Sequence, residues 1–142
     1  MNFLVMLEDD LDRISRFRAV LALYHPEATL GVYRSAPDFI AGYSSLDRIP
    51  DLVCLDHDLF ADSPDDPDPG DGRDVAAFLV TRQPIAPALI HSTNAVAADS
   101  MLYSMRDASW NVERIAPLGE DWIESYWFPT AREMVAAHEG QR

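Results

Sequence analysis

Short apolar runs alternate along the chain with segments that carry apolar residues at helical spacing. Runs without polar interruptions are typical of strands buried on both faces of a parallel sheet. The run at 28–33 is weaker because Gly31 interrupts it, and we expect it nearer an edge of the sheet. The predicted strands are 3–7, 28–33, 52–55, 88–90 and 111–115.

Between these runs, apolar residues spaced three and four apart predict helices that bury one face. Ser35 supplies an N-cap and Pro37 a first-turn position for the second helix. Pro129 is expected to kink or break the last helix, so that 130–138 continues as a separate turn or helix. The apolar stripes are formed by Leu11, Ile14, Phe17, Leu21, Tyr24, Phe39, Ile40, Tyr43, Val75, Phe78, Leu79, Val96, Leu102, Met105, Trp122, Ile123, Tyr126 and Trp127.

Strand and helix alternate five times, which predicts the α/β class with a doubly wound, five-stranded parallel sheet. A chain of 142 residues is expected to form a single domain over 1–142. Residues 59–72 are rich in Asp and Pro and predict a solvated acidic loop, an insertion without a core of its own. Residues 129–142 are expected to extend the last helix at the C-terminus.

Polar residues follow three of the predicted strands at the point where each strand ends. They are Glu8-Asp9-Asp10, Asp56-His57-Asp58 and His91-Ser92-Thr93-Asn94. Open α/β sheets bind ligands at the carboxyl ends of their strands. The sequence therefore predicts a polar site at this edge of the sheet.

Composition narrows the range of partners. The formal net charge of -13 argues against nucleic acid, whose binding depends on cationic side chains, and the chain contains no lysine. No apolar run approaches the ~20 residues of a membrane helix, and the N-terminal residues lack a basic region and a cleavage site. We therefore expect a cytoplasmic protein without a membrane partner. Cys54, the one cysteine, falls in a buried run and is interpreted as a packing residue.

Four segments together resemble the receiver domain of two-component signalling, over nearly the whole chain. This resemblance implies the sheet order 2-1-3-4-5 and makes Asp56 the candidate phosphoacceptor. The segments are Leu7-Glu8-Asp9-Asp10 with Arg13, the strand from Pro50 to Asp56, Gly70-Asp71-Gly72, and 87–93 with Ser92 at the usual hydroxyl position.

Two departures separate the chain from ordinary receivers. Receivers place a lysine before a proline after the fifth strand, whereas here Ala116 precedes Pro117. The second departure is a histidine beside each functional position, because His57 follows Asp56 and His91 precedes Ser92. This pattern is similar to that of the cyclic-phosphate processing receiver group. That resemblance implies recognition or processing of a cyclic phosphate. The matching segments are Asp56-His57-Asp58-Leu59 and His91-Ser92-Thr93-Asn94.

Glu8, Asp9 and Asp56 form the candidate metal site. Three clustered carboxylates repel one another unless a cation or proton intervenes, and a hard divalent cation such as Mg²⁺ or Mn²⁺ suits oxygen ligands. An acidic rim without a metal is the alternative. The aspartates of the 59–72 loop lack the ligand spacing of an EF-hand and are interpreted as a solvated lid near the pocket.

His57 and His91 are candidate general base and general acid, since imidazole titrates near neutral pH. Asp58 would orient a histidine, while Ser92, Thr93 and Asn94 would donate to phosphate oxygens. The alternative is structural: the histidines satisfy backbone groups and the other three residues cap a helix. Regular strand alternation would turn His57 away from Asp56 and His91 away from Ser92, so that the histidines meet each other across the sheet from the acids. A local bend at the strand ends would instead merge the two clusters.

Two functions therefore compete. The first is a receiver-like protein that binds, and by extension hydrolyses, a small cyclic or nucleotide-like phosphate ester with a divalent metal and a histidine pair. The alternative is a non-catalytic signalling or interaction module, in which Asp56 is a phosphoacceptor or the fold mediates protein contacts. A homodimer surface is a further hypothesis, formed by Trp110, Trp122, Tyr126 and Trp127 unless these residues pack in the core.

Overall fold

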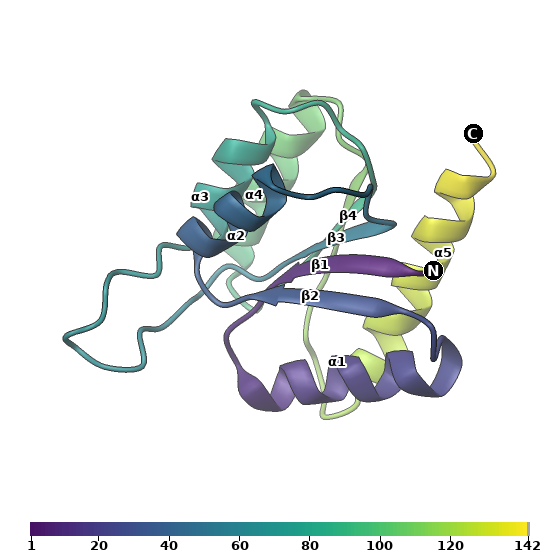
Figure 1. Cartoon of the computed structure of the whole chain (residues 1–142), viewed down its shortest axis with the longest axis horizontal. Helices are drawn as coiled ribbons and strands as arrows, with labels where there is room; N and C mark the ends of the chain where they lie inside the picture. Colours follow the sequence, from purple (N-terminus) through teal and green to yellow (C-terminus); the bar gives the residue numbers. More distant parts are fainter. Residues whose placement is uncertain (142) are drawn as a thin grey trace.

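A five-stranded parallel sheet lies between two layers of helices in the computed structural model, which describes residues 1–141 (Figure 1). The strand order is β2-β1-β3-β4-β5, so the predicted fold and topology are confirmed. The strands are β1 (Phe3–Leu7), β2 (Thr29–Tyr33), β3 (Leu52–Leu55), β4 (Ala88–His91) and β5 (Val112–Ile115).

The helices α2, α3 and α4 cover one face of the sheet, and α1 and α5 cover the other (Figure 1). A π-helical segment, η1, runs directly into α5. The helices are α1 (Leu11–Tyr24), α2 (Ala36–Ser44), α3 (Gly72–Leu79), α4 (Ala95–Asp107), η1 (Ile123–Trp127) and α5 (Phe128–Glu139).

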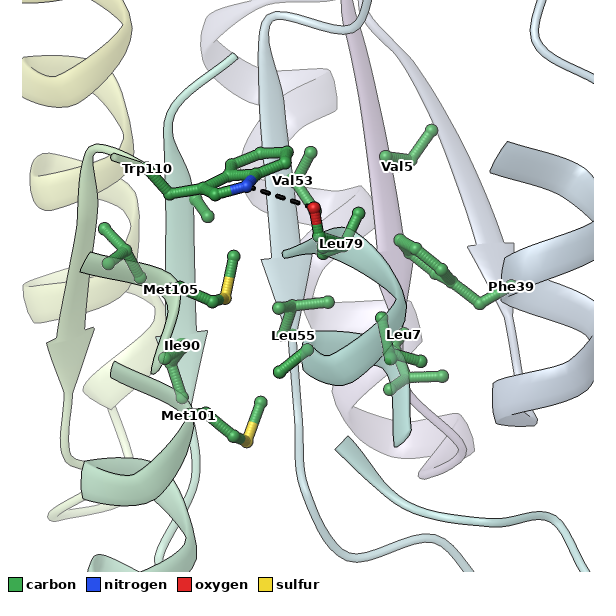
Figure 2. Packing of buried hydrophobic residues seen from close by; sticks show 14 of the residues in the cluster. Val5, Leu7, Phe39, Val53, Leu55, Leu79, Ile90, Met101, Met105 and Trp110 are labelled. Carbon is green, nitrogen blue, oxygen red and sulfur yellow. Dashed lines mark hydrogen bonds between the residues drawn. The ribbon is translucent and has the colours of Figure 1, made fainter. Parts of the chain in front are cut away.

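Side chains of each central strand alternate between two cores. Val53 and Leu55 of β3 face the core under α2, α3 and α4, which Figure 2 shows with Trp110 donating its indole N–H to the Leu79 carbonyl oxygen at 3.2 Å. Leu52 and Cys54 face the opposite core under α1 and α5. This alternation decides which polar side chains meet at the ends of the strands.

Four residues predicted to face inward are exposed, namely Leu11, Tyr24, Val96 and Tyr126. Val96 is 75% exposed because the buried stripe of α4 consists of Ala97, Ala98, Met101, Leu102 and Met105, and Val96 lies in the first turn off that stripe. Most residues of the hypothetical homodimer surface also lie in the core. The three tryptophans Trp110, Trp122 and Trp127 are buried, which leaves Tyr126 as the exposed member of that set.

Pro129 does not break the last helix. Phe128 donates its backbone N–H to Ile123, five residues earlier, so the π-helical turn widens the helix just before the proline. A proline has no N–H and crowds the preceding turn, and the wide turn accommodates both effects. Within 129–142, α5 buries Ala131, Met134 and Val135; Arg142 lies outside the described residues.

The acidic loop connects β3 to α3 without helix or strand over 59–71 and projects beyond the carboxyl ends of the strands (Figure 1). Gly72 ends it, where a Cβ would lie 2.3 Å from the Asp56 carbonyl oxygen, so α3 packs closely against the end of β3. No helix within residues 1–141 has the length and apolarity to cross a membrane.

Candidate metal and phosphate site

Three carboxylates meet where β1 and β3 end. Glu8 follows β1 and Asp56 follows β3, and Leu7 pairs with Leu55 in the sheet, so the two acids continue neighbouring strands on the same face. Asp9 adds a third carboxylate, and one oxygen from each of the three lies within 4.8 Å of the others. We call the cavity that these residues line, about 370 Å³ in volume, the acid pocket. Its other lining residues are Asp10, Arg13, Asp58, Phe60 and Thr93.

Glu8 is fully buried and held from both sides. Its Oε2 accepts the backbone N–H groups of Asp9 at 3.0 Å and Asp10 at 3.2 Å, while its Oε1 lies 3.1 Å from Nε2 of His91. His91 is also fully buried, and its ring packs against Phe17 and Trp122. The imidazole therefore contacts a carboxylate of the acid pocket from behind and has no access to the cavity.

Arg13 brings a positive charge into the acid pocket. Its Nη1 lies 3.7 Å from Glu8 Oε1 and 3.7 Å from Asp56 Oδ2, and its guanidinium group lies over the buried Trp122 ring. The N-cap Asp10 fixes the first turn of α1 by accepting the Arg13 backbone N–H. Of the lining residues described within 1–141, Arg13 is the one with a basic side chain.

The carboxylates ionise unequally. Burial and the negative charge of Glu8 raise the pKa of Asp56 to about 8, with the His57 backbone N–H opposing the rise. Burial also disfavours ionisation of Glu8, but the hydrogen bond and charge interaction with His91 outweigh it and lower its pKa. Burial also raises the pKa of Asp9, although the hydrogen bond from the Phe60 N–H opposes the rise. Glu8 thus holds the negative charge, and Asp56 holds a proton near neutral pH.

This donor set fits a divalent cation. Three carboxylate oxygens at close range are the ligands that Mg²⁺ and Mn²⁺ prefer. Burial and the Glu8 carboxylate raise the pKa of Asp56 although the charge of Arg13 opposes the rise, and a bound cation would favour the ionised carboxylate in place of the proton.

His57 lies on the other face of the sheet. Leu55 pairs with Ile90, so Asp56 is level with His91, and His57 with Ser92. Nδ1 of His57 lies 2.7 Å from Asp58 Oδ1, and its Nε2 lies 3.6 Å from Asp71 Oδ2. Gly72 donates its N–H to the His57 carbonyl oxygen. His57 therefore joins the two ends of the acidic loop.

The predicted meeting of the two histidines is wrong. Each strand is regular to its end, but His91 falls on the face of Glu8 and Asp56, and His57 on the opposite one. The one-residue difference in position between the two histidines in the register puts them on opposite faces. Their assignment, with Asp58, as catalytic residues stays a prediction, and burial of His91 does not favour direct contact with a ligand.

The predicted phosphate-binding residues fall into two groups, one that lines the acid pocket and one that makes local contacts at the start of α4. Thr93 is exposed and lines the acid pocket. Ser92 is buried, and its hydroxyl oxygen accepts the Asn94 N–H at 3.1 Å. Asn94 caps α4 through Ala97 and donates its side-chain amide to Asp58 at 3.3 Å. The capping interpretation therefore describes the observed contacts of Ser92 and Asn94.

Three residues of the acid pocket were not predicted as site residues, namely Asp10, Arg13 and Phe60. Arg13 lies five residues after Glu8, and helical geometry after Asp10 returns its side chain to the strand end. The missing lysine was the signal that could have directed attention to a nearby arginine. Phe60 lies at the start of the acidic loop, and its N–H donates to Asp9 Oδ2 at 2.6 Å. The loop is irregular, so no periodic pattern in the sequence predicts where this residue lies.

The sheet order and the acids at its edge define a receiver fold, and solved structures agree. The chain is similar to a CheY-like receiver domain from Methanospirillum hungatei JF-1, with a TM-score of 0.73, 13% identity, and coverage of 100% of this chain and 99% of that one. It is also similar to the receiver domain of the sensor histidine kinase PA1611 from Pseudomonas aeruginosa PAO1, solved with a magnesium ion coordinated in the active site cleft. There the TM-score is 0.65 and the identity 12%, covering 95% of this chain and 98% of that one.

The family follows from the sequence match. Residues 4–107 match the model of the cyclic-phosphate processing receiver domain, and the chain belongs to that family. No curated protein matches the chain.

Proposed function

We propose that the protein binds Mg²⁺ or Mn²⁺ through Glu8, Asp9 and Asp56, and binds a small cyclic phosphate ester beside that cation. The observation that carries the proposal is the convergence of three carboxylates and one guanidinium group in one cavity, in a chain without lysine. Family membership supports the class of ligand. The magnesium ion in the cleft of the PA1611 receiver supports the class of metal.

The residues of the acid pocket would divide the work. A bound cation supplies positive charge that polarises a phosphoryl oxygen. Arg13 offers a planar fork of N–H donors to the phosphate, in the role that a lysine has in ordinary receivers. Thr93 adds a hydroxyl group at the rim. His91 acts as a positioning residue, because it orients Glu8 and favours its ionised form.

We extend the proposal to hydrolysis of the ester, with Asp58 and His57 handling the proton. Asp58 lines the acid pocket, and its carboxylate lies within hydrogen-bond distance of His57 Nδ1. The hydrogen bond to His57 lowers the pKa of Asp58, so this carboxylate stays ionised and can accept a proton. Asp58 would take a proton from a water molecule whose oxygen bonds to phosphorus while one ring P–O bond breaks, and the proton would then pass to the leaving alkoxide oxygen. His57 would hold Asp58 in place during this transfer.

Calorimetry tests binding directly. Wild-type protein is titrated with Mg²⁺ or Mn²⁺ and then with a panel of cyclic phosphates, and products are followed by chromatography. Asp9→Asn should abolish metal and ester binding, whereas Asp12→Asn, an exposed acid of α1 outside the acid pocket, should leave both unchanged. Absence of binding by the wild-type protein to every ester would overturn the proposal.

A second candidate function is a stand-alone signalling module with Asp56 as phosphoacceptor. The observation that favours it is the receiver arrangement of Glu8, Asp9 and Asp56. Acetyl phosphate should then modify Asp56, and beryllofluoride should bind it, in the wild-type protein and not in Asp56→Asn. If neither reagent acts on the wild-type protein, this function is excluded.

A further inference from the structure

One exposed aromatic side chain stands between the acid pocket and a second cavity. Phe60, at the start of the acidic loop, is 73% exposed and lines both. The second cavity, about 490 Å³ in volume, lies between the loop and the start of α2. Its walls include Arg34, Asp38, Asp62 and Pro67. A ligand with its phosphate in the acid pocket would therefore extend past Phe60 into this cavity.

Phe60 is held in place by the acid pocket itself. Its backbone N–H donates to Asp9 Oδ2 at 2.6 Å. Arg34 ties the next part of the loop to the same residue, because its Nη2 lies 3.1 Å from Asp62 Oδ1 and donates to the Asp9 carbonyl oxygen at 3.3 Å. The backbone at Phe60 is thus held beside a proposed metal ligand, and the exposed phenyl ring projects from that point.

The charges of the second cavity restrict what it accepts. Its walls carry Asp38, Asp62, Asp66 and Asp68 against a single arginine, Arg34. A second phosphate group would be repelled there, while a neutral planar group would not. Carboxylates also accept hydrogen bonds from exocyclic amino groups. The cavity thus suits the uncharged end of a ligand that carries one phosphate.

We propose that Phe60 is a stacking platform for a nucleobase, and that the ligand is therefore a nucleoside cyclic phosphate. The phosphate occupies the acid pocket, and the base stacks on Phe60 in the second cavity. Any base has a π-face that can stack on an aromatic side chain. The acidic wall adds a preference for bases with amino groups, such as adenine. This inference rests on the proposed function.

The test compares two esters that differ in the base. Adenosine 2′,3′-cyclic phosphate and the 2,3-cyclic phosphate of methyl riboside are titrated into wild-type protein, Phe60→Ala and Phe60→Trp with saturating Mg²⁺. The wild-type protein and Phe60→Trp should prefer the adenosine ester by about 5- to 150-fold, the range of one base stack. Phe60→Ala should lose that preference and bind the riboside ester as the wild-type protein does. Tyr103→Ala, an exposed aromatic of α4, is the matched control and should change neither affinity.

The failures are distinguishable. If the wild-type protein prefers the adenosine ester and Phe60→Ala keeps the preference, or if Phe60→Ala weakens both esters equally, the platform is wrong while the proposed function stands. The platform is also wrong if the wild-type protein binds both esters equally. Binding of neither ester by the wild-type protein, with its thermal unfolding unchanged by either, shows that this inference is wrong. The proposed function is overturned with it only when the other cyclic phosphates of the panel also fail to bind.

Discussion

His91 ends β4 and His57 lies just after the neighbouring strand β3, yet the two histidines lie in different surroundings. His91 is fully buried, contacts Glu8 and packs against the rings of Phe17 in α1 and of Trp122, just before η1. His57 lies on the other face and contacts two half-exposed aspartates, Asp58 and Asp71, at the ends of the acidic loop. One histidine supports the acid pocket from inside the core, and the other joins the ends of a surface loop. Two similar motifs thus acquire different roles from a difference of one position in register.

Removing His91 should have the largest effect on the stability of the protein. In His91→Ala, Glu8 keeps a buried carboxylate without its partner, and breaking a buried pair typically costs about 3–5 kcal/mol. We expect that loss in the free energy of unfolding, measured with urea. His91→Gln retains an N–H donor for Glu8 and should lose less. A loss below about 1 kcal/mol in His91→Ala would contradict the buried contact.

The pH dependence of metal binding sharpens the account of Asp56. Its pKa is raised to about 8, so below that pH a cation must displace a proton. Mg²⁺ affinity should rise about tenfold per pH unit from pH 6 to about 8 and then level off. In the absence of metal, raising the pH should instead lower the stability of the fold. A folded pKa above the unfolded value of about 3.9 stabilises the fold at low pH, and this stability is lost as pH rises through about 8. A flat calorimetric profile would contradict the assignment.

Removing the arginine of the acid pocket should act in opposite directions on the two ligands. Arg13→Ala removes a positive charge 3.7 Å from two carboxylates, so Mg²⁺ affinity should rise by about tenfold. The affinity for a cyclic phosphate should fall by a similar factor because the guanidinium donors are lost. Arg16→Ala, on the same helix but outside the acid pocket, is the control. A parallel change of both affinities would show that Arg13 does not contact the phosphate.

Removing His57 should have the smallest effect. In His57→Ala the contact with the half-exposed Asp58 is lost, and a hydrogen bond of this kind contributes about 1 kcal/mol. Metal affinity should stay within about twofold of the wild-type value, because His57 lies across the sheet from Glu8. Urea denaturation and calorimetry measure the two effects. A fall in metal affinity as large as that of His91→Ala would remove the distinction between the two histidines.

Much of the fold could be predicted from the sequence. Continuous apolar runs located β1, β3 and β4, and β3 has the predicted bounds of 52–55. The strands predicted at 28–33 and 111–115 correspond to β2 and β5. Helical faces were predicted less well: Val96 and Leu11 are apolar but exposed, because position on a stripe and not apolarity alone decides burial. Pro129 also shows the limit of a local rule, since a π-helical turn accommodates it.

The sequence likewise predicts some residues of the candidate site and not others. Glu8, Asp9 and Asp56 could be grouped because each follows a strand, and all three carboxylates do meet. The faces of His57 and His91 depend on the register of β3 against β4, which a single sequence does not contain. Phe60 depends on the path of an irregular loop, and hydrogen bonding to Asp9 fixes that path.

The most direct test of the central claim measures whether metal and phosphate share the acid pocket. Bound Mn²⁺ is paramagnetic and broadens the phosphorus NMR signal of a phosphate in contact with it. With wild-type protein and Mn²⁺, the signal of a bound cyclic phosphate should broaden strongly, and Asp9→Asn or a chelator should remove the effect. A signal that stays sharp while the ester is shown to be bound would contradict the claim.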